Sequence, residues 1–458
     1  MQKTVVINVV GLTHSLIGKH TPHLKEFTER SKNATIGSVF PAVTCSAQST
    51  YVTGSWPEDH GIVGNGWYDK EDAEIKFWKQ SNKLVKGEKV WDKARKLDKD
   101  FTCAKMFWWY NMYSTADYSV TPRPMYPADG RKLPDVYAQP ASLRDELQEE
   151  LGQFPLFNFW GPNSSIKSSQ WIAESAKKVE EKYNPTLSLV YLPHLDYCLQ
   201  QKGPDTDKIS KELAEIDNVC GDLIRFFEEK NARVILLSEY GINKVSRPVH
   251  LNRVLRDSKF ISVRNEMGRE LLDAGASKAF AVADHQVAHI YINDKEQKDV
   301  IKSMLEKVEG VERILDDEGK KEFHINHDRA GDLIAIAEED AFFTYYYWLN
   351  DQKAPDFAHC VDIHRKPGYD PAELFLDPNI KYPKLKVGSI LLKKNLGFRY
   401  LMDVIPLEAD LVKGSHGRPA SSRNEEPVLI SNKPDLLVKD HYQPVDVGDV
   451  ILNHLTSQ

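Results

Sequence analysis

The stretch FPAVTCSAQSTYVTGSWPEDHGIVGNG, residues 40–66, decides how the rest of the chain is interpreted. It joins a Pro-flanked turn, the hydroxyls of Thr44 and Ser46, a run of small residues and a Gly-rich loop. A hydroxyl at the junction of a loop and a helix is a common position for a nucleophile, because the first amides of the helix attract an anion. The alternative is a helix cap, in which Thr44 or Ser46 accepts a bond from a free backbone amide. The local pattern leaves both interpretations open.

The composition is that of a globular protein with a hydrophobic core. Of 458 residues, 41% are hydrophobic and 28% are charged, and the net charge is -7. This length allows two domains, or one domain with a large insertion. The charge is spread along the chain and no Lys/Arg-rich run stands out, so we expect no nucleic acid polymer as a partner.

Three features of the sequence bear on its cellular location. The apolar run that begins at Thr4 is too short for a signal peptide and indicates a buried first strand. No apolar run approaches the roughly 18 residues of a membrane-spanning helix, so we expect no membrane partner. The five cysteines are scattered without CxxC pairing, which argues against a disulfide framework and favours a reducing cytoplasm.

Alternating strands and helices predict an α/β fold, with a mainly parallel sheet that has helices on both faces. Apolar runs predict strands at residues 4–10, 34–39, 101–107, 186–192 and 233–237, and helical periodicity predicts a helix at 207–230. From about residue 260, shorter strands and turns indicate an α+β cap or insertion. We therefore expect a core of residues 1–259, a cap of residues 260–350, and a return to the core in residues 351–458.

Polar residues follow several of the predicted strands, where ligand groups gather in parallel sheets. These residues are Thr44, His194, Asp196, Glu239 and Tyr240, and His416 lies in a later glycine-flanked turn. Carboxylates and histidines from separate strand ends are the usual ligands of divalent metals. If the chain stays extended after residue 192, His194 and Asp196 point to the same side. The alternative is structural, with His194 in a loop, Glu239 as a helix cap and His416 in a turn.

Two further groups of polar residues compete with this set. His285 and His289 fall on one predicted strand, about 13 Å apart, so one ion would not bind both and we expect structural histidines. Asp362, His364 and Asp370 lie in a Pro/Gly-containing loop. Loops can wrap side chains around an ion or an anion, so this loop is a candidate part of the active site.

The order of the landmarks is the most specific signal in the chain. The first strand is followed by Thr44, VTG (52–54), PEDHGI (57–62), Asp196, SEYG (238–241) and SHG (415–417). In this order the chain resembles the alkaline phosphatase superfamily, most closely its type I phosphodiesterase/nucleotide pyrophosphatase branch, to which phosphonoacetate hydrolases are related. The resemblance spans nearly the whole chain. It implies an alkaline-phosphatase-like core and places the family's nucleophilic threonine on Thr44.

The resemblance also implies a divalent metal, zinc, as one or two ions. In that family one ion is held by an Asp and two His, and the other by two Asp, a His and the nucleophile. Asp196 and His416 match ligands of the first ion, and Glu239 stands where the second has an Asp. Four other ligand or substrate-binding positions of the family differ in this chain. Val10 stands in place of an Asp, Gln200 and Tyr240 in place of two His, and Ala47 in place of an Asn.

The leading hypothesis is a metal-dependent phosphoester hydrolase in which Thr44 attacks the phosphorus of a small substrate. Its metal contacts would be Asp196, Glu239 and His416. The changed positions leave three versions open. One is a rearranged site that recruits His194, Glu239, Asp362, His364 or Asp370. Another is a site for one metal ion, held by Asp196, His416 and a neighbour. The third is a catalytically altered member that binds a phosphorylated ligand or a partner without hydrolysis. The sequence predicts neither the substrate nor the oligomeric state.

Overall fold

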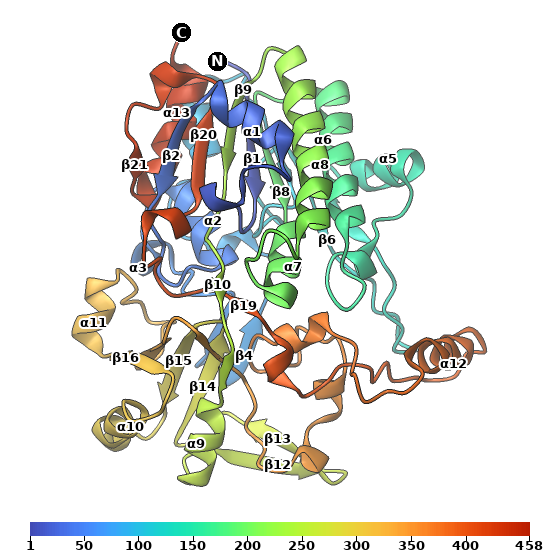
Figure 1. The fold of residues 1–458 in the computed structure, drawn as a ribbon, viewed down its shortest axis with the longest axis vertical. Coiled ribbons are helices and arrows are strands. Elements are labelled where there is room, and N and C mark those ends of the chain that lie inside the picture. Colours follow the sequence, from blue (N-terminus) through green and yellow to red (C-terminus); the bar gives the residue numbers. More distant parts are fainter.

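The computed structural model describes all 458 residues, and a nine-stranded sheet forms its centre (Figure 1). Strand β1 (Thr4–Val9) lies in the middle and pairs in parallel with β8 (Leu187–Leu192) and β9 (Arg233–Leu237). Every residue of the three strands is buried. Strands buried on both faces need apolar residues at successive positions, which is why these three were readable from the sequence.

The sheet is mostly parallel, as predicted. Its order is β21-β2-β20-β9-β1-β8-β5-β6-β7, and only the pairs β2–β20, β20–β9 and β6–β7 are antiparallel. The remaining strands are β2 (Lys32–Ile36), β5 (Cys103–Met106), β6 (Tyr118–Pro122), β7 (Val136–Gln139), β20 (Val428–Ser431) and β21 (His441–Tyr442).

Helices cover both faces of this sheet. The helices α1 (Pro22–Glu29), α6 (Ile166–Tyr183) and α8 (Ser210–Glu229) cover one face, and α2 (Thr44–Thr53), α4 (Val90–Leu97) and α13 (Val447–Thr456) cover the other. Successive side chains of β1 point to opposite faces of the sheet and pack against different helices. Val5 packs in the hydrophobic cluster that includes Leu223 of α8. Its neighbour Val6 packs in a separate cluster with Ile451 of α13. The predicted α/β core is therefore confirmed.

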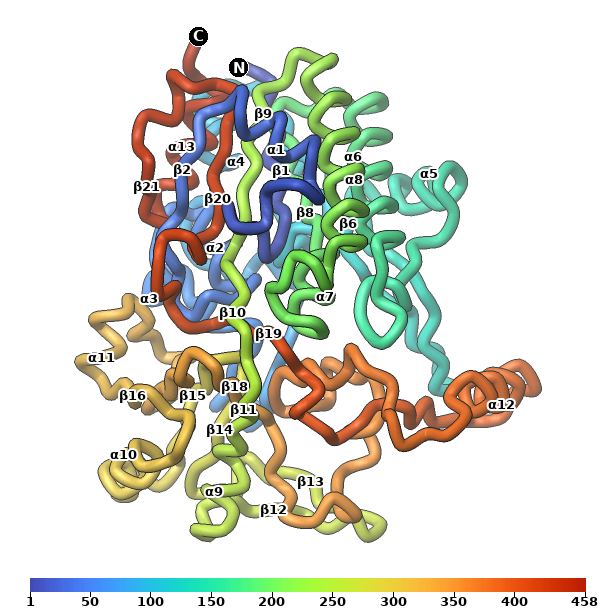
Figure 2. The backbone as a smooth tube through the Cα atoms, in the orientation of Figure 1, coloured from blue at the N-terminus to red at the C-terminus, as the bar shows by residue number.

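A smaller antiparallel sheet forms the lower part of the molecule in Figures 1 and 2. Its order is β14 (Ala279–Asp284), β15 (Val287–Ile292), β17 (Leu333–Ala337) and β16 (Val311–Leu315). The prediction of one strand through residues 285 and 289 was wrong. A two-residue turn at His285 and Gln286 joins β14 to β15, and His285 has a left-handed backbone with φ of 61°.

Short elements complete the chain, and one helix stands away from the rest. The helix α12 (Pro383–Asn395) projects from the side of the molecule in both views (Figures 1 and 2). The other helices are α3 (Pro57–His60), α5 (Ser142–Leu151), α7 (His194–Lys202), α9 (Leu251–Asp257), α10 (Lys298–Leu305) and α11 (Asp317–Glu322). The other strands are β3 (Gly66–Asp69), β4 (Glu74–Phe77), β10 (Asn243–Lys244), β11 (Arg247–Val249), β12 (Ser262–Glu266), β13 (Arg269–Asp273), β18 (Ala341–Phe343) and β19 (Gly414–Ser415). None of the helices combines the length and the apolar character that crossing a bilayer requires.

Candidate functional site

The carboxyl ends of β1, β8 and β9 meet at one edge of the central sheet, where parallel α/β proteins bind ligands. Asp196 follows β8 in the first turn of α7, and Glu239 follows β9 two residues after its end. Thr44 is the first residue of α2, and His416 directly follows β19. All four side chains belong to buried residues. The fold thus brings these four predicted site residues together.

The hydroxyl of Thr44 does not cap its helix. Val43 is the N-cap residue of α2, and no side chain caps that end. Ser46 does not cap it either, because its hydroxyl donates to the carbonyls of Pro41 and Val43. The helix-cap interpretation is therefore wrong. The Thr44 Oγ1 atom instead lies 3.1 Å from Tyr240 Oη.

Tyr240 connects Thr44 to Asp196. Its hydroxyl donates to Asp196 Oδ1 over 3.2 Å, so it can accept the bond from Thr44 at the same time. The second oxygen of Asp196 accepts from Gln200 Nε2 over 2.8 Å, and Tyr369 Oη donates to Gln200 Oε1 over 2.8 Å. Burial raises the pKa of Asp196 to about 7, although the bonds from Tyr240 and Gln200 oppose the rise.

Glu239 is held by two side-chain amides. Its Oε1 atom accepts from Asn8 of β1 over 2.6 Å and from Gln48 of α2 over 2.5 Å. Burial raises the pKa of Glu239 to about 8, although the bonds from Gln48 and Asn8 oppose the rise. Its other oxygen, Oε2, is buried without a partner. Glu239 therefore retains a proton at neutral pH and has a free oxygen to donate it from.

His416 lies in a stack of rings. Its Nδ1 atom is 2.7 Å from the carbonyl of Ala42, which assigns the proton to Nδ1 and leaves Nε2 3.6 Å from Asp196 Oδ1. The Tyr240 ring stacks on it at a centroid distance of 3.7 Å, and the His285 ring lies at the same distance. Tyr369 stacks on His285 at 3.6 Å. Burial lowers the pKa of His416 to about 3, so the imidazole is neutral.

The other predicted site residues lie elsewhere. The α7 helix begins at His194, so the chain is not extended there, and His194 faces Glu215 of α8 at 3.3 Å. In the loop of residues 362–370, Asp362 lies 3.6 Å from the guanidinium of Arg365, and His364 Nδ1 is 3.4 Å from the Phe77 carbonyl. Asp370 is paired with Lys366. None of these side chains bonds to Thr44, Asp196 or Glu239.

Sequence reasoning missed three residues around the candidate site, namely Asn8, Gln48 and Tyr369, and it interpreted a fourth, His285, as a structural histidine. Asn8 interrupts an otherwise apolar strand, and Gln48 lies on a fully buried helix; both are polar exceptions that could have been noticed. Tyr369 carried no local signal. His289, by contrast, is structural as expected, with Nε2 2.9 Å from the Val63 carbonyl and Nδ1 accepting from Gly331.

We tested whether these residues fit the two zinc ions that the family resemblance implies. Val10 places a fully buried hydrocarbon where a carboxylate would be needed. Both oxygens of Asp196 already accept bonds from neutral donors, and the ring of Tyr240 lies against His416. No group of three or more His, Cys, Asp or Glu side chains is arranged to hold a metal ion. The residues present do not fit a two-metal centre.

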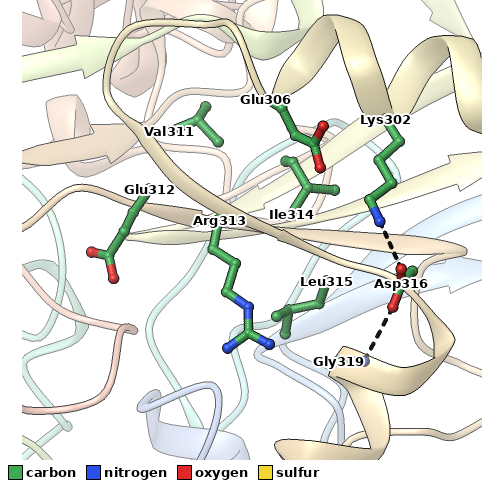
Figure 3. A pocket seen from close by; sticks show the side chains of 9 residues that line it. All are labelled: Lys302, Glu306, Val311, Glu312, Arg313, Ile314, Leu315, Asp316 and Gly319. Carbon is green, nitrogen blue, oxygen red and sulfur yellow. Dashed lines mark hydrogen bonds and ion pairs between the residues drawn. The ribbon is translucent and has the colours of Figure 1, made fainter.

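One surface hollow lies outside this region. It measures about 420 Å³ and is formed by α10, β16 and the start of α11 (Figure 3). Lys302 and Asp316 pair across it, and Asp316 also caps α11 through the amide of Gly319. Its charged side chains are of both signs, which gives no preference for an anionic ligand.

Comparison with known families supports the resemblance inferred from the landmarks. The sequence model described as Type I phosphodiesterase / nucleotide pyrophosphatase matches residues 4–370. An uncharacterized pyrophosphatase/phosphodiesterase of Schizosaccharomyces pombe is 27% identical over 254 residues, which is 53% of this chain and 45% of that protein. Human ectonucleotide pyrophosphatase/phosphodiesterase family member 1 is 24% identical over 235 residues, 49% of this chain and 22% of that protein. The matched part spans less than half the length of these curated relatives.

Solved structures share the fold over almost the full chain. Human ectonucleotide pyrophosphatase/phosphodiesterase 5 gives a TM-score of 0.61 at 14% identity, covering 99% of this chain and 95% of that chain. An inactive variant of the murine counterpart, in complex with AMP, gives the same values. Phosphonoacetate hydrolase from Sinorhizobium meliloti 1021, in complex with phosphonoformate, gives 0.62 at 13% identity, covering 99% and 96%.

Proposed function

This chain belongs to the type I phosphodiesterase / nucleotide pyrophosphatase family, and from that membership we propose that it hydrolyses phosphoesters with Thr44 as the nucleophile. The observation that carries the proposal is the line of Thr44, Tyr240 and Asp196, joined by hydrogen bonds of 3.1 and 3.2 Å. A hydroxyl is a weak nucleophile until a base accepts its proton. The line supplies a route from the Thr44 hydroxyl to a carboxylate.

In the first step, Thr44 Oγ1 attacks phosphorus as its proton passes to Tyr240 Oη and the Tyr240 proton passes to Asp196 Oδ1. The bond between phosphorus and the leaving oxygen breaks, and this oxygen takes a proton from Glu239. Burial raises the pKa values of both carboxyl groups to near neutrality, that of Asp196 to about 7 and that of Glu239 to about 8. At neutral pH the first can accept a proton and the second can donate one.

In the second step, water attacks the phosphorus of the phosphothreonine and gives its proton to Glu239. Thr44 Oγ1 leaves with the proton that returns from Asp196 through Tyr240. Both carboxyl groups then have their starting protonation, and one water is consumed for each ester bond. The amino end of α2 begins at Thr44, and its partial positive charge favours a phosphoryl group there. No step is assigned to a metal ion, because the residues present do not fit the two-metal centre that the family resemblance implies.

We propose a small phosphorylated compound of the nucleotide class as the substrate, since a murine relative of the same fold is described in complex with AMP. The cytoplasm remains the proposed location. This rests on the five cysteines, which are all free and buried. Unpaired thiols in this number are typical of a reducing compartment.

The second candidate is a catalytically altered member that binds a phosphorylated ligand or a partner protein without hydrolysis. The charge of the site favours it. No lysine or arginine bonds to Thr44, Asp196, Glu239 or His416, and no group of three or more His, Cys, Asp or Glu side chains that could hold a metal ion is found there. Phosphoryl transfer depends on neutralising the charge of the transferring group, so a site without cations would hydrolyse slowly.

The two candidates are separated by an assay of bis(p-nitrophenyl) phosphate hydrolysis on protein whose metal content has been measured. We expect turnover that persists in a chelator and falls at least about 100-fold in Thr44→Ala. Tyr240→Phe is the matched variant, because it keeps the ring against His416 and removes only the hydroxyl. It should lower kcat by about tenfold or more and leave the fold unchanged.

Each contrary outcome removes a specific part of the proposal. Full turnover in Thr44→Ala would eliminate Thr44 as the nucleophile. Turnover that appears only with zinc would overturn the metal-free scheme. If the wild-type chain hydrolyses nothing yet binds AMP in a calorimeter, the second candidate is correct.

A further inference from the structure

The outer side of α12 carries an apolar stripe that no part of the chain covers. Leu385, Leu392 and Leu396 are exposed by 72%, 59% and 64%. Their spacings of seven and four residues place them on one side of a helix. Scattered exposed leucines are ordinary on protein surfaces, but an aligned set on a projecting helix is a candidate interaction surface.

The opposite side of α12 already attaches it to the protein. Ile390 is 6% exposed, and Val387 packs against Val404 and Ile405. A helix at the surface of a globular protein needs one apolar side for this purpose. The second apolar side of α12 has no role in the fold, because its leucines are exposed, and the helix itself projects from the body of the molecule (Figure 1).

The same segment is strongly basic in an acidic protein. Residues 378–402 contain no Asp or Glu, whereas the whole chain has a net charge of -7. The basic residues are Lys381, Lys384, Lys386, Lys393, Lys394 and Arg399. Only Lys386 has a carboxylate partner, Asp403 at 2.9 Å. The leucine stripe is therefore bordered by cations that nothing in the chain neutralises.

The apolar surface continues past both ends of the helix. Tyr382 is 60% exposed before it, and Phe398 and Leu401 are 64% and 46% exposed after it. Aromatic side chains with aliphatic neighbours and lysines are the composition of helices that lie in the interface of a bilayer. This segment begins after residue 370, where the match to the family ends.

We propose that α12 and its flanking residues dock on a bilayer surface that contains anionic phospholipids. The leucine stripe enters the boundary of the acyl chains, and the lysines extend to the headgroups. A second copy of the chain is disfavoured as the occupant, because a two-fold contact would bring the unpaired lysines of both copies together. The expectation of no membrane partner was based on the length needed to span a bilayer. It does not apply to a helix that lies on the surface.

The test is co-sedimentation of the full chain with vesicles of phosphatidylcholine, and with vesicles in which about 30% is replaced by phosphatidylserine. We expect binding to the anionic vesicles at least about tenfold tighter than to the neutral ones, weakened by salt. The variant Leu385→Ser/Leu392→Ser/Leu396→Ser should lose at least about tenfold in binding, because three apolar contacts disappear. Its near-UV circular dichroism should match wild type, since these side chains support nothing in the fold.

Two control variants make the result specific. Leu97→Ser/Leu349→Ser/Val438→Ser removes three side chains that are 65%, 53% and 78% exposed elsewhere and should bind as wild type does. Leu392→Trp keeps the stripe apolar, and its emission should shift to the blue on anionic vesicles. Equal binding to both vesicle types, or unchanged binding in the triple serine variant, would overturn the proposal. The proposal would also be overturned if the wild-type chain formed a dimer, or bound an acidic protein and not the vesicles, and the triple serine variant did not.

Discussion

Replacing Lys366 by methionine tests the packing of the loop that brings Tyr369 to the site. The Lys366 ammonium lies 2.7 Å from Asp370 Oδ2 and 2.8 Å from Glu373 Oε1, and no more than 4% of any of these side chains is exposed. Burial alone would lower the pKa of Lys366, but the two carboxylates outweigh burial and raise it above its ordinary value. The ammonium is therefore charged, and methionine removes that charge while keeping most of the side-chain length.

The expected loss of unfolding free energy depends on the hydrogen bonds that the two carboxylates keep in the variant. Removing one member of a buried ion pair costs about 3–5 kcal/mol of unfolding free energy. Here one ammonium serves two carboxylates, which increases the cost. Glu373 keeps its bonds from Trp160 Nε1 at 2.6 Å and from the Asp362 amide at 2.8 Å, and these bonds limit the cost. We expect Lys366→Met to lower the free energy of unfolding by about 4 kcal/mol at alkaline pH.

The loss should depend on pH in a definite direction. Burial raises the pKa of Asp370, and Lys366 opposes this rise. Without Lys366 the pKa of Asp370 rises further in the folded state and keeps its ordinary value in the unfolded state. Between those two values the folded variant binds a proton that the unfolded chain does not, so its stability increases as the pH falls. The deficit relative to wild type should shrink by more than about 1 kcal/mol between about pH 8 and pH 5.

Urea unfolding followed by circular dichroism, at both pH values, measures these differences. Lys19→Met is the surface control, because Lys19 and its partner Asp207 are 69% and 75% exposed and the loss should stay below about 1 kcal/mol. Lys366→Met combined with Asp370→Asn and Glu373→Gln should recover most of the stability, since no buried charge is then left unpaired. The reasoning would be refuted if Lys366→Met were as stable as the Lys19→Met control, or if its loss of unfolding free energy relative to wild type were the same at both pH values.

Three further outcomes follow from other features. Gly241→Ala should lower the melting temperature in scanning calorimetry, because its Cβ would lie 2.1 Å from the Glu425 carbonyl oxygen and the backbone would have to move. Burial raises the pKa of Asp284 to about 7, so the folded chain binds a proton that the unfolded chain lacks between about pH 4 and 7. Urea unfolding of wild type against Asp284→Asn should therefore show wild type losing up to about 1.4 kcal/mol per pH unit as the pH rises. A thiol reagent should find no reactive cysteine in the native protein and all five in urea, because every cysteine is buried and free; rapid native labelling would contradict that burial.

The central sheet could be predicted from the sequence because its strands are buried on both faces. The predicted strand at 233–237 coincides with β9, and that at 186–192 differs from β8 by one residue. The hairpin at His285 could not be predicted, because a left-handed turn usually shows as Gly or Asn and here a histidine adopts it. A strand that is buried on both faces appears in the sequence as a continuous apolar run. A turn that tertiary packing imposes leaves no such pattern.

The grouping of the candidate site residues could be predicted where it depends on the ends of strands, but not where it depends on tertiary contacts. Thr44, Asp196, Glu239 and His416 lie next to regular elements, so their positions follow from the order of those elements. The bridge made by Tyr240, and the contact of Tyr369 with Gln200, depend on distances between segments far apart in the sequence. His194 was misplaced because α7 begins there, and a helix turns residues two apart away from each other.

The position of β2 has a consequence for how the chain assembles during synthesis. This strand leads directly into the Thr44 segment, yet its neighbours in the sheet are β20 and β21, which come from the last part of the chain. Its hydrogen-bonding partners therefore leave the ribosome long after β2 itself. The Thr44 segment, which follows β2, acquires its complete surroundings only after β20 and β21 have been made. The order of folding at this edge of the sheet is thus the reverse of the order of synthesis, and a chain cut short before β20 would leave β2 as an unpaired edge open to aggregation.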